Sequence, residues 1–190
     1  MQHSQEPIRT PRLILRQWQP SDLPVYAALN ADPEVRRFWP TLLTRAQSDE
    51  QAEGFQRHIE EHGFGFWALE VPGVAPFVGF TGLMRVDSSM PFAPGVEIGW
   101  RLAREHWGKG YVTEAARAAL ADGFGRLGLS EIVSYAVVGN EASFSVMKRI
   151  GMNRDQAGDL DIPGREALHR RAELYRVHRN QVNAANGNSR

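Results

Sequence analysis

The chain has 190 residues, of which 42% are hydrophobic and 23% charged, and it contains no cysteine. These values fit one globular domain and exclude a disordered chain, a disulfide scaffold, thiolate metal sites and a cysteine nucleophile. The 22 basic residues balance 22 acidic ones. The sequence therefore lacks the basic excess that is typical of nucleic-acid-binding proteins, and a nucleic-acid partner is not expected.

The N-terminal segment has neither the basic nor the apolar region of a signal peptide. No apolar run approaches the roughly 18 residues that a membrane-crossing helix needs. The sequence therefore predicts a cytoplasmic protein without a membrane partner. We expect residues 1–8 and the polar residues 179–190 to be flexible, and residues 9–178 to form a single domain.

Short strands and helices alternate along the chain. We expect a strand at 12–18, a helix that begins with Ser21 as N-cap, and a second helix from a capping box of Thr44 and Gln47 to about His62. Further strands are expected at 64–71, 76–86, 95–102, 131–138 and 171–178, and further helices at 108–127 and 141–150. This order predicts an α/β (α+β) fold, in which helices cover both faces of a mixed sheet.

The segment Trp107-Gly108-Lys109-Gly110-Tyr111 joins a predicted strand to a predicted helix. Two glycines permit a tight turn and a close approach of ligand to backbone, and the unpaired amides of a helix start favour negative charge. Lys109 adds a positive charge. The pattern predicts a phosphate-binding turn, although a plain strand-to-helix corner would use the same glycines. Neither the dinucleotide fingerprint nor the nucleotide phosphate loop is present.

The sequence WGKGYVTEAA at 107–116 resembles the acetyl-coenzyme A motif of the GNAT superfamily of N-acetyltransferases. The flanking TPRLILR, VGFTGL, EIGWRL and GNEASFSVMKRIGM are similar to the branch that contains the ribosomal-protein N-terminal acetyltransferases. The resemblance covers about residues 9–179. It implies a GNAT fold, with a mixed, mostly antiparallel sheet of six to seven strands that splays at its central strands.

The resemblance also implies a reaction and its partners. Acetyl-coenzyme A would donate an acetyl group to a primary amine, either a protein N-terminus or a small molecule. No cysteine is available to carry an acetyl-enzyme, so the amine would attack the thioester directly. A homodimer is left open, and no metal is implied.

Family members bind coenzyme A with residues that can be matched here. The strand end, the turn and the helix start would supply Trp100, Leu102, Trp107, Gly108, Lys109, Gly110, Tyr111, Val112 and Thr113. An amide near Leu102 would face the thioester oxygen, unless this strand end is simply paired in the sheet. Asn140 would contact the pantetheine arm, although it is also a good helix N-cap.

Glu97 and Ser143 are the candidate catalytic residues. Glu97 could take a proton from the incoming ammonium, or it could be a surface glutamate paired with Arg85 or Arg101. The tyrosine that many family members use as general acid would fall at Met147, which cannot donate a proton. Ser143 is the nearest hydroxyl that could replace it. An acyl-CoA-binding module with weak or no turnover is therefore the alternative function.

Two further groups of residues, a histidine pair and an aromatic loop, give weaker indications of a site. His58 and His62 are four residues apart, but no third ligand lies near them, so we expect a solvated helix face and no metal site. Residues 36–39, Arg-Arg-Phe-Trp, fall in the loop that forms the acceptor wall in GNAT proteins. The aromatic side chains of this loop would line an amine or peptide slot, or they would belong to the core.

Overall fold

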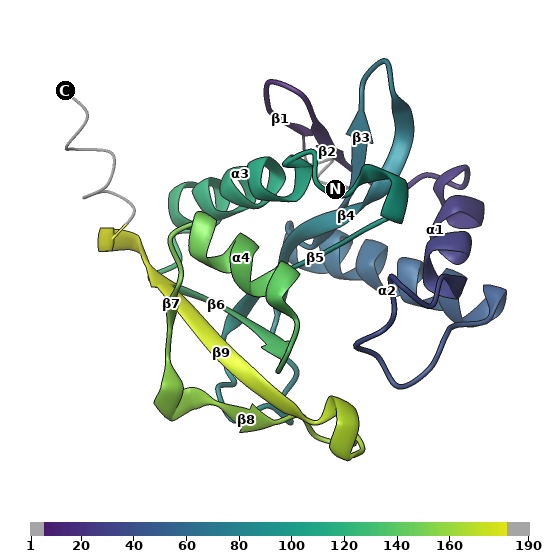
Figure 1. Ribbon diagram of the computed structural model, residues 1–190. Helices are drawn as coiled ribbons and strands as arrows, with labels where there is room; N and C mark the ends of the chain where they lie inside the picture. The colour runs from purple at the N-terminus through teal and green to yellow at the C-terminus, as the bar shows by residue number, and fades with distance from the viewer. Residues whose placement is uncertain (1–5, 182–190) are drawn as a thin grey trace.

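The computed structural model describes residues 6–181 (Figure 1). These residues form one nine-stranded sheet in the order β1-β2-β3-β4-β5-β6-β9-β7, with β8 paired to β9. All pairings are antiparallel except that of β5 with β6. The strands are β1 (Ile8–Arg9), β2 (Ile14–Arg16), β3 (Phe66–Val71), β4 (Ala75–Arg85), β5 (Val96–Leu102), β6 (Glu131–Val137), β7 (Asn153–Arg154), β8 (Leu160–Asp161) and β9 (Arg171–His178).

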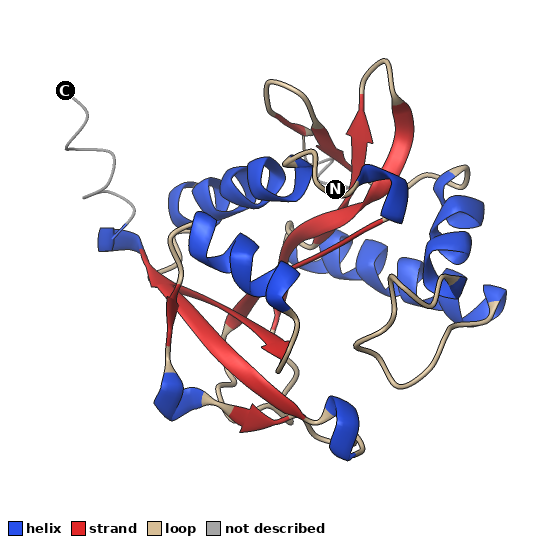
Figure 2. Ribbon diagram, in the orientation of Figure 1, coloured by secondary structure: helices blue, strands red, loops and turns tan. Residues whose placement is uncertain are grey.

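Four α-helices pack on this sheet, with α3 and α4 on one side and α1 and α2 on the other (Figure 2). They are α1 (Asp22–Ala31), α2 (Arg45–His62), α3 (Tyr111–Gly125) and α4 (Glu141–Arg149), and the short 3-10 helices are η1 (Arg104–His106), η2 (Gln156–Gly158) and η3 (Ala167–His169). The predicted α/β fold with a mostly antiparallel sheet is confirmed. Within residues 6–181, no helix is both long and apolar enough to cross a membrane.

Several predicted boundaries need correction. The helix expected from 108 begins at Tyr111, because Gly110 adopts a left-handed conformation (φ 79°) as its N-cap. Ser21 does not cap α1 with its side chain; instead the Asp22 carboxylate accepts the Gln19 amide at 2.8 Å. The capping box of Thr44 and Gln47 is confirmed. The two-residue strands β1, β7 and β8 were not predicted, since two residues carry no detectable period.

The predicted flexible ends fall mostly outside the described residues, which exclude 1–5 and 182–190. Of the remainder, Ile8 lies in β1 and pairs with Leu15. At the other end, the Arg179 guanidinium donates hydrogen bonds to the Leu129 carbonyl at 2.6 and 2.8 Å.

The two faces of the sheet are packed differently. On the α1 and α2 face, aromatic rings dominate the core: Trp18, Tyr26, Phe55, Phe66, Phe77 and Phe80. On the α3 face, small side chains let the helix approach closely. A Cβ at Gly123 would lie 2.6 Å from Leu83 Cδ1 of β4 and 2.8 Å from Ile132 Cδ1 of β6. Close packing of α3 fixes where its N-terminus, and so the glycine turn, is presented.

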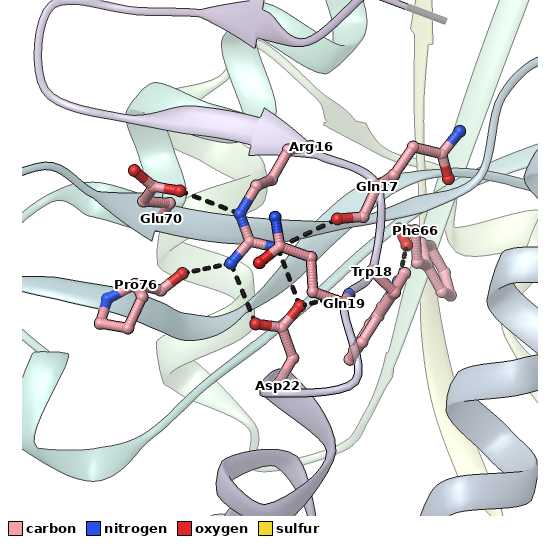
Figure 3. A network of polar contacts seen from close by, with 8 residues as sticks. All are labelled: Arg16, Gln17, Trp18, Gln19, Asp22, Phe66, Glu70 and Pro76. Carbon is pink, nitrogen blue, oxygen red and sulfur yellow. Dashed lines mark hydrogen bonds and ion pairs between the residues drawn. The ribbon is translucent and has the colours of Figure 1, made fainter. Parts of the chain in front are cut away.

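The start of α1 is fixed by a buried ion pair (Figure 3). Arg16 of β2 donates two hydrogen bonds to the Asp22 carboxylate, at 2.8 and 2.9 Å, and a third to Glu70 at 2.9 Å. Its guanidinium also contacts the carbonyls of Gln17 and Pro76. Because the side chains of Arg16 and Asp22 are almost fully buried, this network joins β2, β3 and α1 into one unit.

The sheet opens between β5 and β6, the predicted splay of the central strands. The two strands share one backbone pairing, Glu97 with Val133. One residue further along, the Ser134 hydroxyl donates to the Ile98 carbonyl at 2.9 Å. Beyond Ile98, β5 continues beside β4 alone, so a gap between β5 and β6 faces the start of α3.

Candidate active site

A cavity of about 1260 Å³ lies at this opening. It runs from the segment before β2, past the glycine turn and the end of β5, to the start of α4 and the 34–39 loop. Ten of the predicted site residues line it: Trp100, Leu102, Trp107, Gly108, Gly110, Tyr111, Val112, Thr113, Asn140 and Ser143. Lys109 and Glu97 do not line it.

The glycine turn presents backbone amides to this cavity. Gly108 and Gly110 both have positive φ, 73° and 79°. The first hydrogen bond of α3 runs from the Glu114 amide to the Gly110 carbonyl, so the amides of residues 111–113 precede the helical ladder and have no partner within it. Three adjacent donors at the positive end of a helix form an anion-binding arrangement.

Arg12 brings a positive charge to the turn in addition to that expected from Lys109. Its guanidinium donates to the Lys109 carbonyl at 2.9 Å and to the Glu114 carboxylate at 2.6 Å. Thr10 donates to the same carboxylate at 2.7 Å. Burial raises the pKa of Glu114, but these hydrogen bonds outweigh it and leave the pKa below its usual value. A charged Glu114 therefore ties the turn to the N-terminal segment.

The end of β5 turns backbone groups toward the gap. The Ala103 amide donates to Val78 on the β4 side, whereas the Ile98 carbonyl accepts from Ser134 on the β6 side. Because main-chain groups alternate along a strand, those of Trp100 and Leu102 point to the open side. The Leu102 carbonyl accepts a hydrogen bond from the Trp107 indole at 2.9 Å. The strand end is thus not fully paired within the sheet.

At the start of α4, the N-cap expectation for Asn140 is met, because its side chain accepts the Ser143 amide at 3.3 Å. Asn140 and Ser143 both line the cavity. Met147, one turn after Ser143, is 1% exposed and belongs to the main core. The position at which the family tyrosine would fall is therefore occupied by a core side chain.

Glu97 lies on β5 beside Tyr135 of β6. Burial raises the pKa of Glu97 to about 7, although the Tyr135 hydroxyl contact lowers it and nearby Asp87 raises it further. Among the described residues it makes no ion pair with Arg85 or Arg101, the pairings that the sequence left open. A partly buried carboxyl group with a pKa near neutrality can exchange protons with a substrate.

The 36–39 loop forms one wall of the cavity. Arg37, Phe38 and Trp39 line it, whereas Arg36 is buried behind them. Trp39 stacks on the Arg101 guanidinium, 4.3 Å from the ring centre. The sequence left open whether these aromatic residues line a slot or belong to the core, and it did not pair them with an arginine of β5.

The prediction that His58 lies on a solvated helix face is wrong, because its ring is half-buried and has a structural role. Its Nδ1 lies 2.8 Å from the Phe64 carbonyl, and its Nε2 accepts the Arg85 amide at 3.2 Å. Accepting at Nε2 requires a neutral ring, and burial correspondingly lowers the pKa of His58. Across residues 6–181, no group of three or more metal-ligating side chains is found.

Three contributors to the site were missed: Arg12, Tyr135 and Arg165. Arg12 meets Glu114 across 102 positions, and Arg165 donates to the Phe38 carbonyl across 127. Tyr135 meets Glu97 across two strands. A single sequence holds no signal for contacts at such separations, because the sheet alone brings these segments together.

Comparisons with known proteins agree on the family. The chain matches the model of the acetyltransferase (GNAT) domain over residues 12–153. It is 32% identical to the uncharacterized protein YkkB of Bacillus subtilis over 145 residues, which cover 76% of this chain and 83% of YkkB. It is 29% identical over 152 residues to an uncharacterized N-acetyltransferase of that organism, YoaA, covering 78% and 83% of the two chains.

Solved structures share the fold. A GNAT-family acetyltransferase from Bacillus anthracis superimposes with a TM-score of 0.77 at 21% identity, over 92% of this chain and 99% of that one. A spermidine N-acetyltransferase from Vibrio cholerae, solved with CoA and spermine, gives a TM-score of 0.71 at 20% identity, over 90% and 98%.

Proposed function

Since the chain belongs to the GNAT family of acetyltransferases, which transfer an acetyl group from acetyl-coenzyme A, we propose that it acetylates a primary amine at the cavity beside the β5–β6 gap. The observation that carries the proposal is the continuity of this cavity. It joins three unpaired amides at the start of α3 to the open backbone end of β5.

Acetyl-coenzyme A would bind with its pyrophosphate at the glycine turn and its thioester at the end of β5. Its pyrophosphate would accept hydrogen bonds from the amides of residues 111–113, with Arg12 adding positive charge. Its pantetheine arm would lie along Trp100 and Leu102, as an added strand pairs with an open strand edge. Asn140 would contact the arm from the other side of the gap. Lys109 would add the positive charge of its side chain, while its backbone carbonyl accepts from Arg12.

The chemistry is a direct transfer. The amine nitrogen attacks the thioester carbon, the carbon–sulfur bond breaks, and the coenzyme A thiolate leaves. An ammonium must first lose its proton, and Glu97, which does not itself line the cavity, would accept it through water. The amide of Leu102 would stabilise the negative charge on the carbonyl oxygen. Ser143 would donate its hydroxyl proton to the thiolate and take up in its place the proton that the nitrogen loses as the amide forms. The thiolate is already a good leaving group because thiols ionise near pH 8.5.

One observation favours a second candidate function, an acyl-CoA-binding protein with little turnover. Met147 replaces the tyrosine that family members use as acid, and it is buried in the core rather than lining the cavity. This candidate predicts tight binding of acetyl-coenzyme A with no acetyl transfer to any amine.

A transfer assay separates the two candidates. Release of free coenzyme A thiol would be followed with acetyl-coenzyme A and a panel of amines, which includes peptides with free N-termini, amino acids and diamines. Mass spectrometry of the acceptor would establish acetylation. We expect amine-dependent thiol release that saturates with at least one acceptor class. Tight binding of acetyl-coenzyme A by calorimetry together with background release across the panel would instead favour the binding protein.

A further inference from the structure

Three arginine side chains surround one tryptophan in the acceptor wall. The guanidinium carbons of Arg101, Arg36 and Arg165 lie 4.3, 5.6 and 6.0 Å from the centre of a Trp39 ring. They come from β5, from the loop after α1 and from the loop between β8 and β9. Arg101 and Arg36 are 7% and 5% exposed, and Arg165 is half-buried. Three positive charges thus converge on one small volume.

These charges have no acidic partner among residues 6–181. Arg101 donates to the Asn30 side-chain oxygen at 2.6 Å, Arg36 to the Thr41 carbonyl and Arg165 to the Phe38 carbonyl. Arg101 Nε and Arg36 Nη1 are buried without a hydrogen-bond partner in the described structure. Burial and mutual repulsion lower the pKa of Arg36 to about 10. Uncompensated buried cations are costly, so an unpaired group of three calls for an anion.

The position of the group separates it from the cofactor phosphates. The Arg101 side chain points to Asn30 of α1, whereas the glycine turn leads into α3 on the opposite side of the sheet. Arg101 is nevertheless the neighbour of Trp100 and Leu102, where the thioester is proposed to lie, and it lines the same cavity. An anion at Arg101 would therefore belong to the acceptor rather than to coenzyme A.

We propose that the acceptor amine carries an anionic oxyacid group, a carboxylate or a phosphate, which Arg101 binds beside Trp39 in the cavity that both line, while Arg36 and Arg165 add positive charge from behind the lining. The inference rests on the proposed function, because the anion is taken to be part of the acceptor. It names the acceptor class: an anionic amine is favoured, and a polyamine, which is cationic along its length, is disfavoured by the same charges.

The test compares linear primary amines of matched chain length that differ only at the far end. The far end is a methyl, a carboxylate, a phosphonate or a second amine, and kcat/KM is measured for each across several chain lengths. We expect the best anionic amine to exceed the matched alkylamine at least tenfold, and the diamine by more, since a charged hydrogen bond to arginine is strong and specific. Comparing kcat/KM for the carboxylate-bearing and phosphonate-bearing amines shows which anion is preferred.

Variants connect this preference to the arginines. Arg165 is half-buried, so Arg165→Gln is expected to fold, and it should reduce the anionic preference, measured as the ratio of kcat/KM for the anionic amine to that for the matched alkylamine, about tenfold. Arg101→Gln should do the same more strongly. The control is Arg170→Gln, an exposed arginine of the same loop that is paired with Asp161 at 2.6 Å, and it should leave the preference unchanged. A melting curve of each variant separates loss of preference from loss of fold.

Two failures can be told apart. If alkylamines and diamines are acetylated as well as anionic amines, this inference is wrong and the proposed function stands. If no amine is acetylated, the proposed function fails, and calorimetry with coenzyme A and the ω-carboxylate amine decides the inference. No binding, or binding equal in wild type and Arg165→Gln, would overturn it. Binding that is lost in Arg165→Gln and kept in Arg170→Gln would support it.

Discussion

The Tyr135 hydroxyl lies beside the Glu97 carboxyl group. Tyr135 follows Val133 by two residues in β6, and Val133 is the residue that pairs with Glu97 where β5 meets β6. Burial raises the pKa of Glu97 from 4.5 to about 7, and the contact with Tyr135 limits that rise. A carboxyl group tuned in this way is half ionised near neutral pH, where a base that takes a proton from an ammonium is most useful.

Glu97→Gln should lower kcat/KM by roughly 10² or more, because the variant cannot accept a proton. The loss should shrink at high pH, where free amine becomes abundant. It is measured from the pH profiles of wild type and variant, with exposed Glu60→Gln as the control. A loss that is constant across the pH range would contradict a base and indicate a binding role.

Tyr135→Phe removes the contact that lowers the pKa of Glu97. The pKa should therefore rise, and the ascending limb of the pH–rate profile, which reports the ionised base, should move to higher pH with a similar plateau. An unchanged midpoint together with a lower plateau would assign Tyr135 to substrate binding instead.

The same carboxyl group makes stability depend on pH. Its pKa is higher in the folded than in the unfolded chain, so its contribution is fully present below pH 4.5 and is lost as pH rises through about 7. Relative to Glu97→Gln, wild type should lose up to about 3 kcal/mol of unfolding free energy across this window. Urea unfolding of both proteins at pH 4.5 and pH 8 measures the difference, and parallel curves would contradict the elevated pKa.

Gly110→Val should weaken binding of acetyl-coenzyme A tenfold or more, about 1.4 kcal/mol. A side chain at Gly110 would meet the Arg12 guanidinium at 3.3 Å and would strain a backbone with φ 79°. Gly73→Val is the matched control, since Gly73 has φ 77° but lies in the β3–β4 turn with no atom within 4 Å of an added Cβ. Calorimetry on both variants gives the answer: equal affinities would place the pyrophosphate elsewhere.

Ser143→Ala should lower turnover by about tenfold and leave acetyl-coenzyme A affinity unchanged, if Ser143 protonates the departing thiolate. Ser145→Ala is the control, because Ser145 lines the same cavity from the same helix. The comparison variant Met147→Tyr restores the family residue, although a tyrosine in a fully buried position strains the core. Wild-type turnover in Ser143→Ala with faster turnover in Met147→Tyr would make solvent the acid.

Asp22→Asn should destabilise the protein by about 3 kcal/mol, because Arg16 would remain buried without its main counterion. Asp49→Asn, which removes a surface pair between half-buried Asp49 and exposed Arg45 at 2.8 Å, should cost less than about 1 kcal/mol. Urea midpoints at pH 7 compare the two. Similar losses would mean that the Arg16 network is not the stronger of these contacts.

The glycine turn and the order of the elements could be predicted from sequence, because both depend on residues close together in the chain. Gly108 and Gly110 have the left-handed conformations that such a turn requires, and Thr44 forms the cap that its spacing indicates. Site residues that depend on sheet packing could not be predicted in the same way. Arg12 is the clearest case, since it reaches the turn by pairing with Glu114, which is 102 positions away in the chain.

The 36–39 loop at the cavity is a second example of contacts that could not be predicted from sequence. The aromatic residues of the 36–39 loop were recognised as candidates, whereas their partners Arg101 and Arg165 were not. Strand alternation placed Arg101 and Glu97 on one face of β5, but alternation does not say which loops cover that face. One of the covering loops is the β8–β9 connection, which carries Arg165. This connection has no regular hydrophobic pattern from which its position could be predicted.

The link between Arg12 and Glu114 has a consequence for how the chain folds. Closing a loop of 102 residues has an entropic cost that only the assembled sheet can offset, so this contact is expected to form late in folding. Helix α3 can form early from local contacts, yet its first turn acquires its final shape only when the N-terminal segment arrives. A folding intermediate that lacks β1 and β2 would therefore contain the glycine turn without its contact to Arg12. Ligand added during refolding should stabilise the native chain by mass action without accelerating the steps that precede this closure.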